Sequence, residues 1–209
     1  MSYLITYTGK RFDLPSPEPE QIDIVDIAAH LSRITRFVGA TSRFFSVAQH
    51  SVSVAYLSVA VAQYYAPPPH LEMTVLRETL KEGLLHGAHG AYAGDIPSPV
   101  KAMVPGVKEV ESRLDRAIRA KFGLVWDRSP NIKHADAISL ILESDHLRGP
   151  GKLDYDRLST VARDLLPRLA NSTGSKEWFK LAEHTIQQDW SHETAKDKFL
   201  KEWYRVEGE

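Results

Sequence analysis

The chain has 209 residues, of which 43% are hydrophobic and 25% charged, and its 26 basic residues nearly balance its 27 acidic ones. This composition is typical of a globular protein and excludes a disordered or fibrous chain, and the lack of a basic excess argues against binding to duplex nucleic acid. The chain contains no cysteine, which excludes disulfides, thiolate catalysis and cysteine-ligated metal sites, so any metal must be held by histidines and carboxylates.

No segment of the sequence is apolar enough to cross a membrane. The most apolar stretch, residues 46–66, is interrupted by Gln49, His50 and Gln63 and falls short of a run of ~20 apolar residues. Residues 1–15 contain no apolar core of a secretory signal. We therefore expect no membrane association and a cytoplasmic location.

The predicted elements begin with a short β-hairpin. Residues 3–7 are rich in β-formers, residues 8–10 supply a turn, and residues 11–14 form the returning strand. From Ile24 onward, apolar residues recur at spacings of three and four, and this period predicts a first helix that reaches Ile34.

The rest of the chain predicts further helices. The segment 46–65 contains an alternating run that fits a strand, but its length favours a helix. Ser129-Pro130 is typical of a helix start and Gly123 of a helix end. The proline run 67–69 ends one helix, and the Gly-Pro-Gly run 149–151 is the strongest break in the chain. The predicted helices cover residues 46–65, 71–92, 107–122, 130–147, 154–169, 176–190 and 192–204.

Together these elements predict an all-α fold of about seven helices with a short N-terminal β-hairpin. No internal repeat or low-complexity tract divides the chain. We expect a single domain over residues 1–209, in which residues 1–20 form the hairpin and a proline-rich lead-in, residues 21–148 the core and residues 152–209 the C-terminal helices.

Three ionisable residues are predicted to point into the helical core. His50 shares a helix face with apolar residues such as Val47, His86 follows two leucines, and Asp136 lies on another predicted helix. Alone, each histidine fits a satisfied core residue and Asp136 fits a capping or salt-bridging carboxylate. A buried ionisable group is costly unless it is paired or bound to a metal, so three of them predict one polar site where the helices bring them together.

Several ordered stretches of the chain resemble the HD-domain phosphohydrolases, and most closely the branch that contains phage dATP triphosphohydrolases and bacterial 5′-deoxynucleotidases. The match spans most of residues 3–147, which makes it much more specific than one short motif. The resemblance implies an HD-domain helical bundle, a deoxynucleotide (dNTP or dNMP) substrate, a homo-oligomer and, for a phage-encoded chain, the host cytoplasm. The matching stretches are residues 36–39 (RFVG), 43–51 (RFFSVAQHS), 84–86 (LLH), 91–101 (AYAGDIPSPVK) and the helix of Asp136.

The resemblance also implies a divalent metal ion, Mn²⁺, Co²⁺, Zn²⁺ or Mg²⁺. By position, His50, His86 and Asp136 correspond to three of the family's ligands. Two imidazoles and one carboxylate make a three-ligand site that can hold a transition metal and leave coordination positions open.

The resemblance assigns further residues to catalysis and to the substrate. Asp95 matches an acidic residue near the attacking water, and Arg36, Arg43 and Lys101 match positions that contact the phosphates of the nucleotide. Surface solvation is the alternative for each of these cations. Arg43 is followed by two phenylalanines, and a guanidinium beside aromatic rings suits phosphate and base contacts.

Two acidic positions of the family are missing. The aspartate of the His-Asp dyad is replaced by Gly87, and a glutamate used in proton transfer is replaced by Gly90. Loss of the aspartate weakens metal binding, and loss of the proton shuttle costs about 10²- to 10⁴-fold in rate. His89 lies on the same predicted helix face as His86, at i+3, and is a candidate replacement ligand or base.

These substitutions leave two functions open. One is a divergent phosphohydrolase that acts on deoxynucleotides, and the other is a catalytically inactive nucleotide-binding or interaction protein on the same scaffold. Gly83, Gly87 and Gly90 also form a stripe on one predicted helix face. Each glycine costs about 1 kcal/mol relative to alanine inside a helix, so the stripe indicates either a close helix crossing or room for a ligand.

Overall fold

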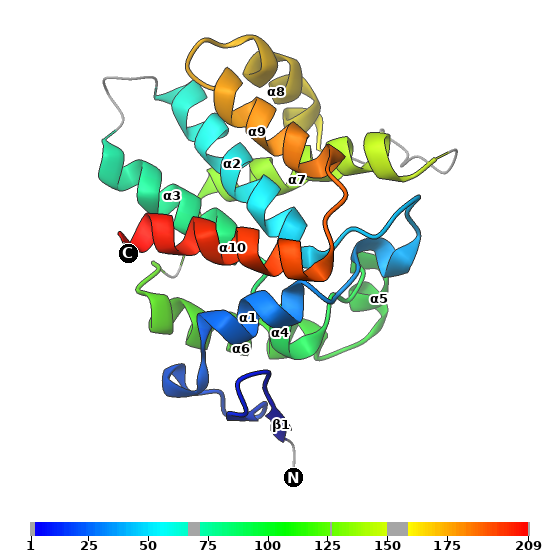
Figure 1. The fold of residues 1–209 in the computed structure, drawn as a ribbon, viewed down its shortest axis with the longest axis vertical. Helices are drawn as coiled ribbons and strands as arrows, with labels where there is room; N and C mark the ends of the chain where they lie inside the picture. Colours follow the sequence, from blue (N-terminus) through cyan, green and yellow to red (C-terminus); the bar gives the residue numbers. More distant parts are fainter. Residues whose placement is uncertain (1–2, 67–71, 126, 150–158, 209) are drawn as a thin grey trace.

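A two-stranded antiparallel hairpin, β1 (Tyr3–Ile5) and β2 (Arg11–Asp13), opens the chain in the computed structural model, which describes residues 3–66, 72–125, 127–149 and 159–208. The hairpin is tied to the first helix because the Asp26 carboxylate accepts hydrogen bonds from the backbone and the hydroxyl of Thr8, at 2.6 and 2.9 Å. Phe12 on β2 is fully buried. These contacts fix the hairpin against the helical body, at whose lower end it lies in Figure 1.

All the other regular elements of the described chain are helices, so the predicted all-α fold with an N-terminal hairpin is confirmed (Figure 1). Two short 3-10 turns, η1 (Pro19–Gln21) and η2 (Arg36–Gly39), join the first elements. The α-helices are α1 (Ile24–Leu31), α2 (Val47–Tyr65), α3 (Met73–Leu85), α4 (Gly90–Ala93), α5 (Ser98–Met103), α6 (Val107–Phe122), α7 (Pro130–Leu147), α8 (Thr160–Asn171), α9 (Lys176–Gln187) and α10 (His192–Glu207).

Helix α2 runs through the middle of the bundle and packs against α3, α7, α9 and α10 (Figure 1). All of its residues except Tyr56, Tyr64 and Tyr65 are buried. A helix covered on every side has no polar face, and its alanines, serines and valines let its neighbours approach closely. The helix predicted over 46–65 is therefore confirmed, and the strand alternative is wrong.

Local start and stop signals place several helix ends correctly. Gly123 ends α6 in the left-handed conformation, at φ 67°. Ser129 accepts a hydrogen bond from the backbone of Asn131, and Pro130 is the first residue of α7. Helices α6 and α7 confirm the predicted ranges 107–122 and 130–147. The two C-terminal helices are confirmed with shifted ends, at Gln187 and Glu207.

The single helix predicted over 71–92 is wrong. Helix α3 ends at Leu85, tight turns follow, and α4 begins at Gly90. In the turns the backbone N–H groups of Ala88 and Gly90 bond to carbonyls three residues back rather than four. Glycines at 87 and 90 weaken the helix at this point, which favours the tighter turns.

Other boundaries differ from the predictions. Helix α1 ends at Leu31 and does not reach Ile34, and the short helix α5 has no counterpart among the predicted elements. The proline run 67–69, residues 150–151 of the Gly-Pro-Gly break and the predicted helix start at 154 lie outside the described residues. In the part of this last helix that is described, α8 begins at Thr160. Among the described helices, none is both long and apolar enough to span a membrane.

Helices α2 and α3 cross at a point where only glycine fits. A Cβ atom on Gly83 would lie 2.7 Å from Cα of Ala55 and 2.9 Å from Oγ of Ser58. One member of the predicted glycine stripe therefore serves a close helix crossing. The crossing lies one turn before His86 and holds the end of α3 against α2.

Substitution of Gly83 by alanine is expected to lower the free energy of unfolding by about 1–3 kcal/mol, because the added methyl group overpacks the crossing. Gly87→Ala is the matched control, since a Cβ atom at position 87 meets nothing within 4 Å. Thermal or urea unfolding of the two variants measures the difference. Equal stabilities would contradict the close-crossing explanation.

Candidate metal and anion site

Three side chains from three helices meet at one point of the bundle. His50 lies on α2, His86 at the C-terminal end of α3 and Asp136 on α7. The two Nε2 atoms are 3.1 Å apart, and an Asp136 oxygen lies 3.3 Å from Nε2 of His50 and 3.9 Å from Nε2 of His86. The structure thus brings together the three ligands predicted from the sequence, in an arrangement that can hold a metal ion.

The other ring nitrogen of each histidine is held in place. Nδ1 of His86 donates to the backbone carbonyl of Gly83 at 2.7 Å, and Nδ1 of His50 lies 2.5 Å from a Glu143 oxygen. A hydrogen bond at Nδ1 fixes the tautomer and turns the Nε2 lone pair towards a shared ligand. Two Nε2 lone pairs at this distance repel each other unless a proton or a cation lies between them. The donor set therefore fits a divalent metal ion.

Glu143 connects the metal ligands to a cation. Its carboxylate is fully buried, and besides His50 it accepts hydrogen bonds from Ser139 at 2.8 Å and from Arg36 at 3.1 Å. Arg36 also lies 3.6 Å from Asp95. Glu143 was not among the predicted site residues, although its spacing of seven residues from Asp136 places it on the same face of α7.

The charges around the site shift the pKa values of the two histidines in opposite directions. Burial and the neighbouring His50 lower the pKa of His86 to about 3, so this imidazole is neutral at pH 7. Burial raises the pKa of Glu143, but the charges of His50 and Arg36 outweigh it and bring the pKa to about 2. Burial and Arg36 also lower the pKa of His50, yet Glu143 and Asp136 raise it overall. A metal at Nε2 of His50 competes with this proton.

The three ligands open into a cavity of about 560 Å³. Asp136 borders this space, and its side chain is 52% exposed, whereas those of His50 and His86 are buried. The charged residues that line the cavity are four cations and two carboxylates: Arg36, Lys101, Arg128, Arg148, Asp95 and Asp136. Three of these cations, Arg36, Lys101 and Arg128, are each paired with a carboxylate behind the wall. The wall therefore offers oriented cationic donors for an anionic ligand rather than a net excess of positive charge.

The structure separates the other predicted site residues into two groups. Asp95, Arg36 and Lys101 line the cavity, as does His89. His89 is not one of the three residues that converge, because its Nε2 faces Glu111 at 3.5 Å.

Arg43 does not line the cavity. Its guanidinium donates to the backbone carbonyl of Ile186 near the C-terminal end of α9 and lies 3.9 Å from Asp189. A cation at this position interacts favourably with the helix dipole. The predicted contact between Arg43 and phosphate therefore receives no support, since tertiary packing assigns the side chain to α9.

Sequence reasoning missed two cations of the cavity. Arg128 precedes α7 and bonds to Asp115 at 2.7 Å, and Arg148 follows the last residue of α7. The guanidinium of Arg148 lies over the ring of Phe37, 5.4 Å from its centroid. Both arginines lie outside the stretches that carry the family resemblance, so no local signal marks them.

The two glycines at the missing acidic positions both line the cavity. Around Gly87 there is open space for a side chain, and a Cβ atom on Gly90 would make only an ordinary contact of 3.6 Å with Leu31. The glycine stripe thus has two roles, a close crossing at Gly83 and room beside the metal ligands at Gly87. A Cβ atom therefore meets no steric obstacle at position 87 or 90.

Two residues at the cavity wall have a strained backbone. Phe37 and Val38 have φ values of 55° and 56°, in the left-handed region, where a β-branched residue is an outlier. The turn is held because the backbone of Arg36 donates to the Phe45 carbonyl at 2.8 Å and that of Ala40 to the Phe37 carbonyl at 3.0 Å. The strained turn contains Phe37, whose ring contacts the guanidiniums of Arg36 and Arg148.

Val38→Asn is expected to raise the free energy of unfolding by about 1 kcal/mol, because asparagine adopts the left-handed region at lower cost than valine. Val38 is 76% exposed, so little packing is lost. Val104→Asn is the matched control, since Val104 is also exposed but has φ −108°. Chemical denaturation measures both changes, and equal effects of the two substitutions would argue against strain at Val38.

Glu143→Gln is expected to weaken divalent-metal binding about 10- to 100-fold, because it removes the charge that orients and polarises His50. Titration with Mn²⁺ or Zn²⁺ measures the affinity, with thermal unfolding of the same samples as a check on folding. Glu78→Gln, at an exposed position of α3, is the control. An unchanged affinity in the folded Glu143→Gln protein would refute the positioning role.

The chain is similar to two bacterial proteins, and no family model matches it. It is 38% identical over 143 residues to the "Uncharacterized protein YfdR" of Escherichia coli K12, a match that covers 68% of this chain and 71% of YfdR. It is 34% identical over 158 residues to the "Uncharacterized protein RCAP_rcc00048" of Rhodobacter capsulatus, covering 72% of this chain and 76% of that protein. The identity and the coverage together show that the chain belongs to the same protein family as YfdR and RCAP_rcc00048.

Proposed function

We propose that the protein is a divergent HD-domain phosphohydrolase that acts on deoxynucleotides with a divalent metal ion. The observation that carries the proposal is the meeting of His50, His86 and Asp136 at the wall of a cavity that four cationic side chains also line. Three protein ligands with open coordination positions are the pattern of catalytic rather than structural metal sites. The cytoplasmic location and the homo-oligomer stay predictions.

His50, His86 and Asp136 would hold the metal, which when bound supplies Lewis acidity for the attack of water on a phosphoester. Arg36 and Lys101 would bind the phosphate oxygens. Each of these cations is paired with a carboxylate that does not line the cavity, Glu143 at 3.1 Å and Glu111 at 2.7 Å. Such pairing fixes the direction of each side chain, so that little ordering is needed when an anion binds.

Asp95 is the candidate to orient the water and accept its proton. Apart from the ligand Asp136, it is the carboxylate that lines the cavity among the described residues. Its contact with Arg36 at 3.6 Å places it next to the proposed phosphate site. With glycine at position 90, proton transfer depends on Asp95 and on His89, the candidate base that also lines the cavity, and we expect slow turnover.

The second candidate function is a nucleotide-binding protein without hydrolytic activity. It is favoured by Gly87 and Gly90, which stand where the resemblance implies a metal ligand and a proton shuttle and which supply neither. Both functions need the same cations at the cavity wall. They differ in whether a metal binds and whether phosphate is released.

The deciding experiment measures metal content and phosphate release for the protein and for the double variant Gly87→Asp/Gly90→Glu. After purification with Mn²⁺, Co²⁺ or Zn²⁺, we expect the unaltered chain to bind metal and to hydrolyse some member of a dNTP and dNMP panel slowly. The double variant restores both acids in existing space, and its rate should rise by about 10²- to 10⁴-fold.

Asp136→Ala, which removes a metal ligand, is the control and should abolish both metal binding and turnover. Nucleotide binding without phosphate release in the unaltered chain would establish the second candidate instead. Absence of metal and of nucleotide binding in both the chain and the double variant would overturn the proposal.

A further inference from the structure

We infer that the segment 95–105, called the hinged wall below, moves as a unit about Gly94 and Gly106. Its movement carries Asp95 and Lys101 towards the metal ligands or away from them. The inference rests on the proposed function for the roles of these two side chains, since displacement of the wall separates a candidate base and a candidate phosphate contact from the site. The movement itself does not depend on hydrolysis.

The hinged wall forms one side of the cavity. Figure 1 shows that the chain between α4 and α6 leaves the bundle, forms α5 at the edge of the molecule and returns. A shift of this segment therefore changes the shape of the cavity and the position of two of its charged groups. The residues of the hinged wall that line the cavity are Asp95, Ile96, Pro97, Ser98, Pro99 and Lys101.

The hinged wall has no anchor in the hydrophobic core. All of its residues are described, and none of them is buried. Helix α5 packs only loosely against the other described helices, and its neighbourhood exposes Val100, Met103 and Val104 at 45%, 81% and 45%. Segments with few buried apolar contacts move at a low cost in free energy. The wall can therefore be displaced while the bundle stays folded.

A glycine with positive φ stands at each end of the hinged wall. Gly94 has φ 82° and ψ 164°, a region that is essentially restricted to glycine, and Gly106 has φ 86° and ψ −17°. A Cβ atom at either position would meet nothing within 4 Å, so close packing does not explain these glycines as it explains Gly83. Because glycine populates both signs of φ, rotation at these two positions costs less than elsewhere.

Between its two glycines the hinged wall is stiff. The backbone N–H of Val100 donates to the carbonyl of Pro97 at 2.9 Å, and that of Val104 donates to the carbonyl of Val100 at 3.1 Å. Prolines at positions 97, 99 and 105 fix φ at three places in the segment. Rotation at the ends therefore displaces the segment without changing its internal shape.

Two ion pairs hold the hinged wall against the bundle. Lys101 lies 2.7 Å from Glu111 of α6, and Asp95 lies 3.6 Å from Arg36. The side chains of Lys101 and Asp95 are 23% and 24% exposed. Partly exposed ion pairs stabilise a conformation only weakly, so these two can break and form again. The structure shows the wall in the position in which both pairs are made.

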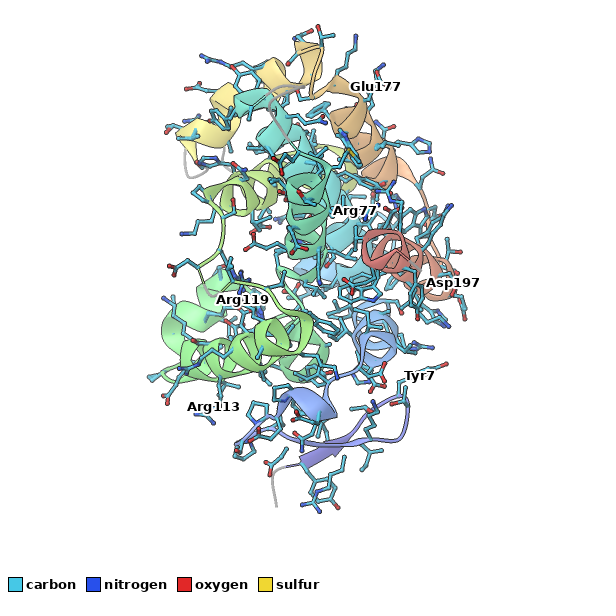
Figure 2. The ribbon with its side chains drawn as sticks, turned by 90° about the vertical axis from the view of Figure 1, so that its left-hand side faces the viewer. Tyr7, Arg77, Arg113, Arg119, Glu177 and Asp197 are labelled. Carbon is cyan, nitrogen blue, oxygen red and sulfur yellow. The ribbon has the colours of Figure 1, made fainter. Side chains whose placement is uncertain are left out.

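The test measures distances between nitroxide labels in the ligand-free protein by pulsed electron spin resonance. The chain contains no cysteine, so labels attach only to introduced cysteines. One pair joins Met103→Cys on the wall to Arg77→Cys on α3, and the reference pair joins Arg77→Cys to Glu177→Cys on α9, on two helices of the bundle (Figure 2). We expect a broader distance distribution for the wall pair. A label at Val100→Cys should show the same broadening, because the wall moves as a unit.

Glu111→Gln removes one of the two ion pairs. The population at the displaced distance should rise about two- to fivefold, the effect of losing one partly exposed ion pair. Glu109→Gln is the matched control, since it makes the same charge change on α6 at an exposed position that contacts Arg113 instead of the wall. Lys101→Gln should cause the same shift as Glu111→Gln, and the double variant no larger one. It also keeps the inference testable if Glu111→Gln fails to fold.

A wall pair with a distribution as narrow as that of the reference pair would overturn the inference, and so would equal shifts in Glu111→Gln and Glu109→Gln. Broadening at Met103 without broadening at Val100 would also overturn it, because it would indicate fraying at the end of α5. Hydrolysis of dNTPs by a protein with an immobile wall would refute only the hinged wall. A mobile wall in a protein that hydrolyses no nucleotide would refute only the proposed enzyme.

Discussion

The buried carboxylate of Glu143 is the interaction on which the site depends. One of its oxygens lies against His50 and the other against Arg36, and its side chain has no exposed surface. A buried charge without partners would cost several kcal/mol, so the positions of His50 and Arg36 are fixed by the same requirement that keeps Glu143 ionised. Helix α2, helix α7 and the turn η2 are thereby held in one arrangement.

This arrangement links two kinds of chemistry. His50 turns its Nε2 atom towards His86 and Asp136, the residues with which it would hold a metal, and Arg36 lines the cavity. Because His50 and Arg36 are both bonded to the Glu143 carboxylate, a change in the charge of one alters the electrostatic environment of the other. The hydrogen bonds from Ser139 to Glu143 and between Ser139 and Ser53 extend the polar network back into the contact between α2 and α7. The site is therefore part of the core rather than an addition to its surface.

Local sequence signals predicted the elements whose ends depend on local chemistry. Gly123 and the Ser129-Pro130 pair fixed the ends of α6 and α7, because left-handed and capping conformations are properties of single residues. The break after Leu85 was missed, since isolated glycines are compatible with a helix and only their combined effect ends it. The meeting of the three ligands was anticipated from ordered motifs on separate helices. The position of Arg43 could not be predicted, because its partner at Ile186 is far away in the sequence.

The contrast between Gly83 and Gly87 separates the requirements of folding from those of chemistry. At Gly83 a single added carbon would collide with α2, whereas at Gly87 an added side chain would enter open space. The close packing of α2 against α3 therefore requires glycine at position 83, whereas position 87 accepts a Cβ atom without a steric clash. Because the cavity-lining position 87 takes no part in the helix crossing, its chemical character can change while the crossing stays intact.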